Sequence, residues 1–160
     1  MTPTPHYVKV AQHAVGKRGD LLVTLGLGSC VAILLQDAAA GVMGMAHVLL
    51  PEPALSRDAA NPYKFATTAV PALVDEMRSM GARLERLEAR LVGGAAMFAA
   101  LMVPGTLNMG ERNLRAARAA LEAAGIPIRA EEVGRDFGRS VRMSAGKTVV
   151  SSVGKPDVTL

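Results

Sequence analysis

Short apolar runs, separated by glycine, proline and charged residues, occupy the first third of the chain. Three of them occur in order, at residues 21–25, 31–35 and 42–50. Short apolar runs bounded by turn residues are typical of buried β-strands. A glycine-rich turn at 26–29 follows the first run, and a turn at 36–41 separates the other two. We therefore predict three buried strands, the last two of which form a hairpin.

Two later segments repeat apolar residues at the spacing of an amphipathic helix. The first is residues 67–80. If this helix is capped by Thr67 or Thr68, Pro71 falls in its first turn, where the missing N–H costs nothing. A helix that begins nearer Tyr63 should kink at the proline. The apolar face of the second helix is formed by Leu114, Ala117, Leu121 and Ala124.

Alternating apolar and polar residues predict further strands with one buried face. These segments are residues 87–91, 126–130, 140–143 and 148–153. The polar, proline-bounded segment 51–62 is expected to be a surface loop. Because strands and helices are mixed, we expect an α/β fold: a single-domain layered sandwich with a buried mixed sheet and two main amphipathic helices.

The composition is that of one folded domain. Half of the 160 residues are hydrophobic and 20% are charged, which excludes a disordered chain. We expect one domain over residues 1–160, with its core at 7–153. No apolar run is long enough to cross a bilayer, and the first six residues lack the pattern of a secretion signal. A cytoplasmic protein without membrane insertion is therefore expected.

The charge balance raises the question of a nucleic-acid partner. The net charge is +4 and the isoelectric point about 9.6. The basic residues are scattered, however, and aromatic side chains that could stack on bases are few, so we expect no nucleic acid. One cysteine excludes an internal disulfide, and with three histidines it makes no closely spaced zinc-ligand set. We therefore expect neither metal nor cofactor.

The single cysteine, Cys30, lies between the glycine-rich turn and the second predicted strand. If residues 37–40 form the hairpin loop, Gln36 pairs with Gly41, and Cys30 lies directly opposite His47. Such a pair shares one face, and an imidazole that accepts the thiol proton lowers the pKa of the thiol. The alternative is that Cys30 is a small buried apolar residue and His47 an ordinary core histidine.

Two sequence motifs contain this pair. They are VTLGLGSCV, at residues 23–31, and MAHVLLP, at residues 45–51, and they place His47 seventeen residues after Cys30. Two further segments belong to the same pattern, at residues 85–98 and 108–113. In these motifs the chain resembles the CheD family of chemoreceptor glutamine deamidases.

The resemblance implies an activity, a site and a three-layer α/β fold. The family's catalytic trio falls on Thr24, Cys30 and His47. The implied reaction hydrolyses glutamine side-chain amides of methyl-accepting chemotaxis receptors to glutamate and ammonia. In that scheme the Cys30 thiolate attacks the amide carbon, His47 moves the proton and Thr24 orients the imidazole. Ser29 and Glu52 are the alternative partners of His47.

Other residues of the motifs support the site less directly. From geometry we infer that the oxyanion of the reaction is bound by the Cys30 backbone N–H and by another N–H of the Gly28–Ser29 turn. Five residues of the later segments would either shape a substrate groove or simply form a strand end and a helix N-terminus. They are Gly93, Gly94, Asn108, Arg112 and Asn113.

Two other functions stay open on the sequence alone. The domain could work as an adaptor that binds receptors, or the CheC-type phosphatase with which the family is known to pair. It could also hydrolyse small amides such as free glutamine. A site that recognises a protein should hydrolyse free glutamine slowly, because the small substrate lacks the distant contacts that supply binding energy. Substitution of Cys30 should abolish deamidation and leave adaptor binding intact.

Overall fold

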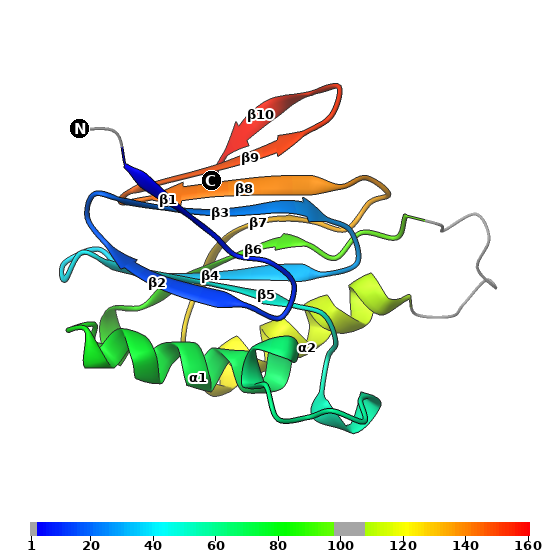
Figure 1. Cartoon of the computed structure of the whole chain (residues 1–160), viewed down its shortest axis with the longest axis horizontal. Helices are drawn as coiled ribbons and strands as arrows, with labels where there is room; N and C mark the ends of the chain where they lie inside the picture. Colours follow the sequence, from blue (N-terminus) through cyan, green and yellow to red (C-terminus); the bar gives the residue numbers. More distant parts are fainter. Residues whose placement is uncertain (1–2, 98–107) are drawn as a thin grey trace.

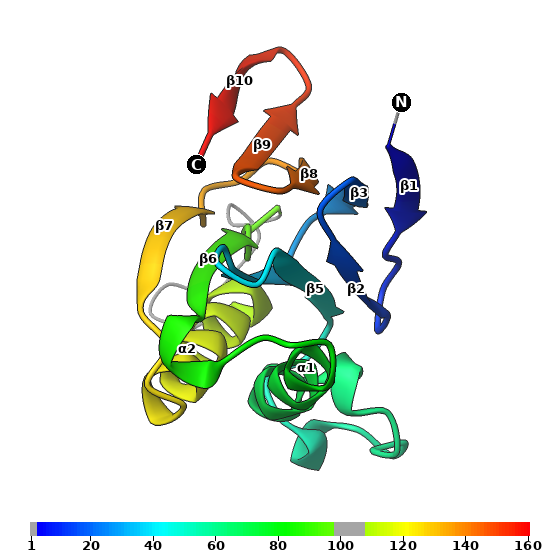
Figure 2. The same ribbon diagram turned by 90° about the vertical axis from the view of Figure 1, so that its left-hand side faces the viewer.

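The described residues fold into three layers. A computed structural model describes residues 3–97 and 108–160. Two five-stranded sheets lie face to face, and two α-helices cover the outer face of one of them (Figure 1). The turned view in Figure 2 shows the same succession of sheet, sheet and helices. The expected class, layered α/β with two main helices, is confirmed, although two mixed sheets take the place of one.

The first sheet is farthest from the helices, and its strand order is β1-β3-β8-β9-β10. Its strands are β1 (Thr4–Tyr7), β3 (Asp20–Leu27), β8 (Arg139–Ser144), β9 (Lys147–Ser152) and β10 (Lys155–Thr159). β1 runs parallel to β3, and the other neighbouring strands are antiparallel. The short strands β1 and β10 form the edges and are exposed along their whole length.

The second sheet is the middle layer, with the strand order β2-β5-β4-β6-β7. Its strands are β2 (His13–Lys17), β5 (Val42–Val48), β4 (Val31–Asp37), β6 (Glu88–Gly93) and β7 (Ile128–Val133). The hairpin of β4 and β5 occupies the centre. Every residue of β5 is buried, because one face packs on the first sheet and the other on the helices. Burial on both faces explains why these strands are continuous apolar runs rather than alternating ones.

The helices are α1 (Ala66–Ser79) and α2 (Met109–Ala123). Phe65 precedes α1 as its N-cap, so neither Thr67 nor Thr68 caps the helix, and Pro71 lies inside it beyond the first turn. Short 3₁₀ turns lie in the loop before α1 and before β6, at Pro53–Leu55, Pro62–Lys64 and Leu84–Arg86. In the described part of the chain, neither helix has the length and apolarity needed to span a membrane.

Two apolar clusters fill the spaces between the layers. One lies between the helices and the middle sheet and includes Val70 and Leu73 of α1. The other lies between the two sheets and includes Leu22, Met45 and Cys30. The cysteine therefore belongs to the core between the sheets, at one end of it.

Candidate active site

Cys30 lies where the chain passes from the first sheet into the middle one. Strand β3 ends at Leu27, Gly28 and Ser29 form the turn, and β4 begins directly after the cysteine. The Cys30 side chain is 9% exposed. Figure 1 shows this turn at the end of the molecule where α2 begins. The thiol is thus at the rim of the core rather than deep inside it.

His47 lies in β5 beside β4, on the same face as the cysteine. The register pairs Ala32 with His47 and Val31 with Val48. The predicted pairing of Cys30 with His47 is therefore wrong by two residues, and the two are diagonal neighbours. Because side chains alternate between the faces of a strand, a shift of two residues keeps Cys30 on the face that carries His47.

Thr24, from the first sheet, holds the imidazole of His47. Its Oγ1 lies 2.8 Å from Nδ1 of His47 and donates to the carbonyl of Val8 at 2.6 Å. Since a hydroxyl has one proton and this one goes to Val8, Nδ1 must carry the imidazole proton and donate it to Oγ1. Nε2 is then the basic nitrogen, and it is buried without a hydrogen-bond partner among the described residues. The hydroxyl that contacts His47 belongs to Thr24 rather than to Ser29.

Burial keeps both groups of the pair neutral at rest. It lowers the pKa of His47, and a hydrogen bond toward the Val8 carbonyl raises this pKa by a smaller amount. Burial also raises the pKa of the Cys30 thiol, against a smaller lowering by its own backbone N–H. The resting site therefore holds a thiol and a neutral imidazole. Sequence reasoning favoured a lowered thiol pKa, and the direction is the opposite.

The residues that follow β6 donate hydrogen bonds to the main chain of the turn that carries Cys30. The N–H of Gly94 donates to the Cys30 carbonyl, and the N–H of Ala95 donates to the Gly28 carbonyl, both at 2.9 Å. Gly93 has a φ of 106°, and a Cβ atom there would lie 2.4 Å from the Cys30 carbonyl oxygen. Both glycines therefore contact the main chain of the cysteine turn, and their part in a substrate groove stays a prediction.

The start of α2 contacts the same turn. Asn108 caps the helix, because its side-chain oxygen accepts a backbone N–H of the first turn at 2.9 Å. Arg112 follows, half-buried. Asn113 is fully buried and donates from Nδ2 to the carbonyls of Ser29, at 2.9 Å, and Leu49, at 3.0 Å. Asn113 thus contacts the turn, Asn108 lines a hollow together with Ser29, and the contact of all three residues with a substrate stays a prediction.

Two hollows flank the site. One, of about 270 Å³, is lined by His47 and by residues that include Tyr7 of β1, Val10 in the segment after β1 and Leu25 of β3. The other, of about 360 Å³, is lined by Ser29, by the residues after β6 and by the first residues of α2. Phe98, the last residue of one family-like segment, lies outside the described residues. Within residues 3–97 and 108–160, no cluster of His, Cys, Asp or Glu could hold a metal ion.

Val8 is the site residue that sequence reasoning missed. Its carbonyl accepts the Thr24 proton and so fixes the tautomer of His47. The parallel pairing of β1 with β3 brings this carbonyl to Thr24. A backbone carbonyl has no residue-type signature, and an exposed edge strand has no apolar alternation, so no sequence signal pointed to it.

The chain is similar to proteins of chemotaxis. The family model described as CheD chemotactic sensory transduction matches residues 49–152. The chemoreceptor glutamine deamidase CheD of Thermotoga maritima is 43% identical over 149 residues, which cover 92% of this chain and 91% of that protein. The probable chemoreceptor glutamine deamidase CheD of Caldanaerobacter subterraneus is 40% identical, with 92% of each chain covered.

Solved structures with a similar course of the chain are more distant. A Neisseria meningitidis protein of the family model DUF152 is 14% identical, with a TM-score of 0.49, over 82% of this chain and 63% of that one. The hypothetical protein YfiH of Bacillus licheniformis is 17% identical, with a TM-score of 0.47, over 76% of this chain. The present chain spans 49% of the YfiH chain.

Proposed function

Because the chain belongs to the CheD family, we propose that it is an amidohydrolase that deamidates glutamine side chains of chemoreceptors to glutamate, with release of ammonia. The observation that carries the proposal is the state of His47. Thr24 occupies its Nδ1, and Nε2 is left as a buried base that has no partner among residues 3–97 and 108–160, on the face that holds the chain's single cysteine.

The first half-reaction forms a thioester. Nε2 of His47 takes the proton of the Cys30 thiol while the sulfur attacks the amide carbon, and the carbonyl oxygen becomes an oxyanion. The imidazolium then gives this proton to the amide nitrogen, the C–N bond breaks and ammonia leaves. Burial raises the pKa of the Cys30 thiol, so the attack requires a base to take its proton, and His47 is that base.

The second half-reaction returns the enzyme to its starting state. His47 takes a proton from water, and the hydroxide adds to the thioester carbon through a second oxyanion. The C–S bond breaks, the new carboxyl group leaves as glutamate, and the thiolate recovers its proton from His47. Cys30 thus ends as a thiol and His47 as a neutral imidazole, as at the start of the cycle.

Thr24 keeps the imidazole oriented through both half-reactions. When His47 is protonated, Nδ1 still donates to Oγ1, and Oγ1 still donates to the Val8 carbonyl. A neutral hydroxyl stabilises an imidazolium less than a carboxylate does. This is consistent with an enzyme that modifies receptors and does not need a high turnover rate.

The oxyanions need donors, and the turn offers them. Within the described residues, the backbone N–H groups of Ser29 and Cys30 donate to no backbone carbonyl. The Cys30 N–H lies near its own sulfur, where it lowers the pKa of the thiol. We assign the oxyanion to this N–H together with that of Ser29.

The hollow beside His47 favours a protein substrate. Tyr7, Val10 and Leu25 are large apolar residues that stay about half exposed around it. An apolar rim supplies binding energy away from the reacting amide, which free glutamine could not use. We place the methyl-accepting cytoplasmic segment of the receptor on this rim, and the reaction in the cytoplasm.

The experiment is intact-protein mass spectrometry of a purified chemoreceptor cytoplasmic fragment, with ammonia measured in parallel. Wild-type protein should add the mass difference between amide and acid, and Cys30→Ala and His47→Gln should add none. Circular dichroism of both variants controls for folding. An unmodified receptor fragment after incubation with folded wild-type protein would contradict the function.

The CheC-type phosphatase is a second proposed partner. Binding measured by calorimetry should be equal for the wild type and Cys30→Ala, because docking needs no thiol. Absence of binding for both forms would contradict this partner and leave the deamidation proposal intact.

A further inference from the structure

Asn113 is the residue of α2 whose side chain hydrogen-bonds to the turn before Cys30. It is fully buried, and its Nδ2 donates to the carbonyls of Ser29 and Leu49 at 2.9 and 3.0 Å. Its Oδ1 is also buried and has no hydrogen-bond donor in the described part of the chain. Two carbonyl acceptors fix the orientation of the amide, because the flipped amide would set oxygen against oxygen.

The Ser29 carbonyl and the Cys30 N–H belong to one peptide unit. A trans peptide is planar, and its C=O and N–H point to opposite sides. None of the described peptide bonds is cis. By holding the Ser29 carbonyl on the side of α2, Asn113 therefore turns the Cys30 N–H to the other side. That N–H is the donor assigned above to the oxyanion.

Three successive backbone carbonyls of the turn accept hydrogen bonds, and of the three the Ser29 carbonyl is the one that accepts from a side chain. The Gly28 carbonyl accepts from Ala95 N–H and the Cys30 carbonyl from Gly94 N–H. The Ser29 carbonyl accepts from Asn113. The middle peptide of the turn is thus the one whose restraint a substitution can remove.

The second hydrogen bond of Asn113, to the carbonyl of Leu49, is with the chain that carries His47. Leu49 follows β5, two residues after His47. One amide group therefore holds the peptide before the cysteine and the main chain after the histidine at a fixed separation.

We propose that Asn113 is a positioning residue, which holds the Ser29–Cys30 peptide so that the Cys30 N–H faces the oxyanion. The inference rests on the proposed deamidation, since both half-reactions pass through an oxyanion on the same carbonyl carbon. It assigns Asn113 no contact with the substrate.

Two variants test the proposal. Asn113→Asp keeps the shape and replaces the donating Nδ2 by oxygen, and Asn113→Ala removes the donor without adding charge. Loss of an oxyanion donor lowers kcat by 10²–10³ in other hydrolases, so misorientation of one should lower kcat by about 10- to 100-fold. KM should stay within about threefold, because the oxyanion is absent from the bound substrate.

Alkylation of Cys30 by iodoacetamide separates this role from a general structural one. Alkylation displaces iodide at a saturated carbon and forms no oxyanion. For Asn113→Ala its rate and pH profile should match those of the wild type, and the single cysteine makes the label specific. Leu121→Ala, which removes a fully buried side chain elsewhere on α2, is the matched control and should lower stability without lowering kcat.

The outcomes separate the inference from the function on which it rests. A folded Asn113→Ala variant with wild-type kcat would overturn the inference and leave the function standing. A parallel loss of kcat and of alkylation rate would also overturn it, since Asn113 would then act on the thiol or on folding. If the wild type itself releases no ammonia from receptors, the proposed function fails and the inference fails with it.

Discussion

Cys30 and His47 hold their protons differently from the same groups in water. Burial favours the neutral form of each, so it raises the pKa of the thiol and lowers that of the imidazole. The base is therefore unprotonated over a wider pH range than an exposed histidine. In the proposed mechanism the thiolate forms when Nε2 of His47 accepts the thiol proton.

The first prediction concerns the pH profile. His47 must be neutral to act as the base, and its pKa lies below the ordinary value of about 6.5. As the pH falls, kcat/KM should therefore decline with a midpoint below about 6.5, the ordinary value for histidine. The measurement is kcat/KM for a receptor fragment from neutral pH downward. An acidic midpoint at or above that of free histidine would contradict the assignment.

The second prediction concerns Thr24. Thr24→Val keeps the shape and removes the hydroxyl, so Nδ1 loses its acceptor and the tautomer is no longer fixed. The rate of ammonia release should fall about 10- to 100-fold, the usual effect of removing a residue that orients a metal-binding imidazole. Thr24→Ser retains the hydroxyl and should stay within a few-fold of the wild type. Equal rates for the valine and serine variants would rule out this role.

At the scale of elements, the hairpin of β4 and β5 shows which features could be predicted from the sequence. Both strands and their shared face followed from the apolar runs, but the register did not. The loop was expected at 37–40, whereas Asp37 still pairs with Val42 and Gly41 lies in the loop with a φ of 68°. A glycine that takes a left-handed conformation belongs in the turn, and this moves each strand end by one residue.

Strands without an apolar pattern were not predicted at all. β1 and β10 are exposed, and in β2 the only buried residue is Gly16, so burial leaves little trace in their sequences. The pairing of β1 with β3 is nevertheless what brings the Val8 carbonyl to Thr24. The trio of Thr24, Cys30 and His47 was accessible from motifs, and its backbone support was not.

The third prediction compares two glycines that have the same positive φ. Gly93 and Gly81 both have a φ of 106°, but a Cβ at Gly93 would meet the Cys30 carbonyl, and one at Gly81 would meet nothing within 4 Å. Gly81→Ala should cost about 1–2 kcal/mol of unfolding free energy through backbone strain alone. Gly93→Ala should cost a further ~1–3 kcal/mol and lower kcat. Urea unfolding and initial rates measure both, and equal losses for the two variants would contradict the contact.

At the scale of the whole molecule, the site depends on both sheets. Thr24 comes from β3 of the first sheet and His47 from β5 of the middle one, so their hydrogen bond crosses the space between the layers. Cys30 lies in the connection between the same two sheets. A change that alters the spacing of the sheets should therefore affect the chemistry even when it touches no catalytic residue.

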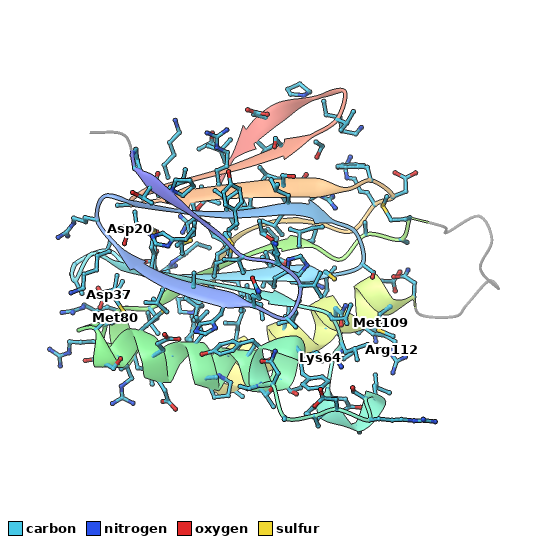
Figure 3. All side chains as sticks on the ribbon, viewed as in Figure 1. Asp20, Asp37, Lys64, Met80, Met109 and Arg112 are labelled. Atoms are coloured by element: carbon cyan, nitrogen blue, oxygen red, sulfur yellow. The ribbon has the colours of Figure 1, made fainter. Side chains whose placement is uncertain are left out.

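The opposite end of the molecule is stabilised by a buried carboxylate. Asp37 is fully buried and accepts from the N–H groups of Ala40 and Arg83 and from Nε of Arg86. Burial raises its pKa, but these donors together lower it by more. In Figure 3, Asp37 lies at the end away from Met109 and Arg112, the residues that mark the start of α2 near the site.

The fourth prediction follows from this anchor. Asp37→Asn should lower the unfolding free energy by about 2 kcal/mol at neutral pH, because the charged hydrogen bonds are lost. Since the folded pKa lies below the unfolded value of about 3.9, this contribution is complete above that value and disappears as the pH falls through the folded pKa. Urea unfolding across acidic pH should show the difference between wild type and variant shrinking there, while kcat at neutral pH stays unchanged. A pH-independent difference would show that the charge of Asp37 is not what stabilises this end.

The neutral state of the resting thiol has a consequence for its reaction with oxidants. Peroxide attacks thiolates, and exposed ones fastest, to give sulfenic acid and then irreversible products. Cys30 is nearly buried and its pKa is raised, so in the absence of substrate it presents little thiolate to an oxidant. Cys30 should therefore be oxidised by peroxide more slowly than an exposed cysteine of ordinary pKa.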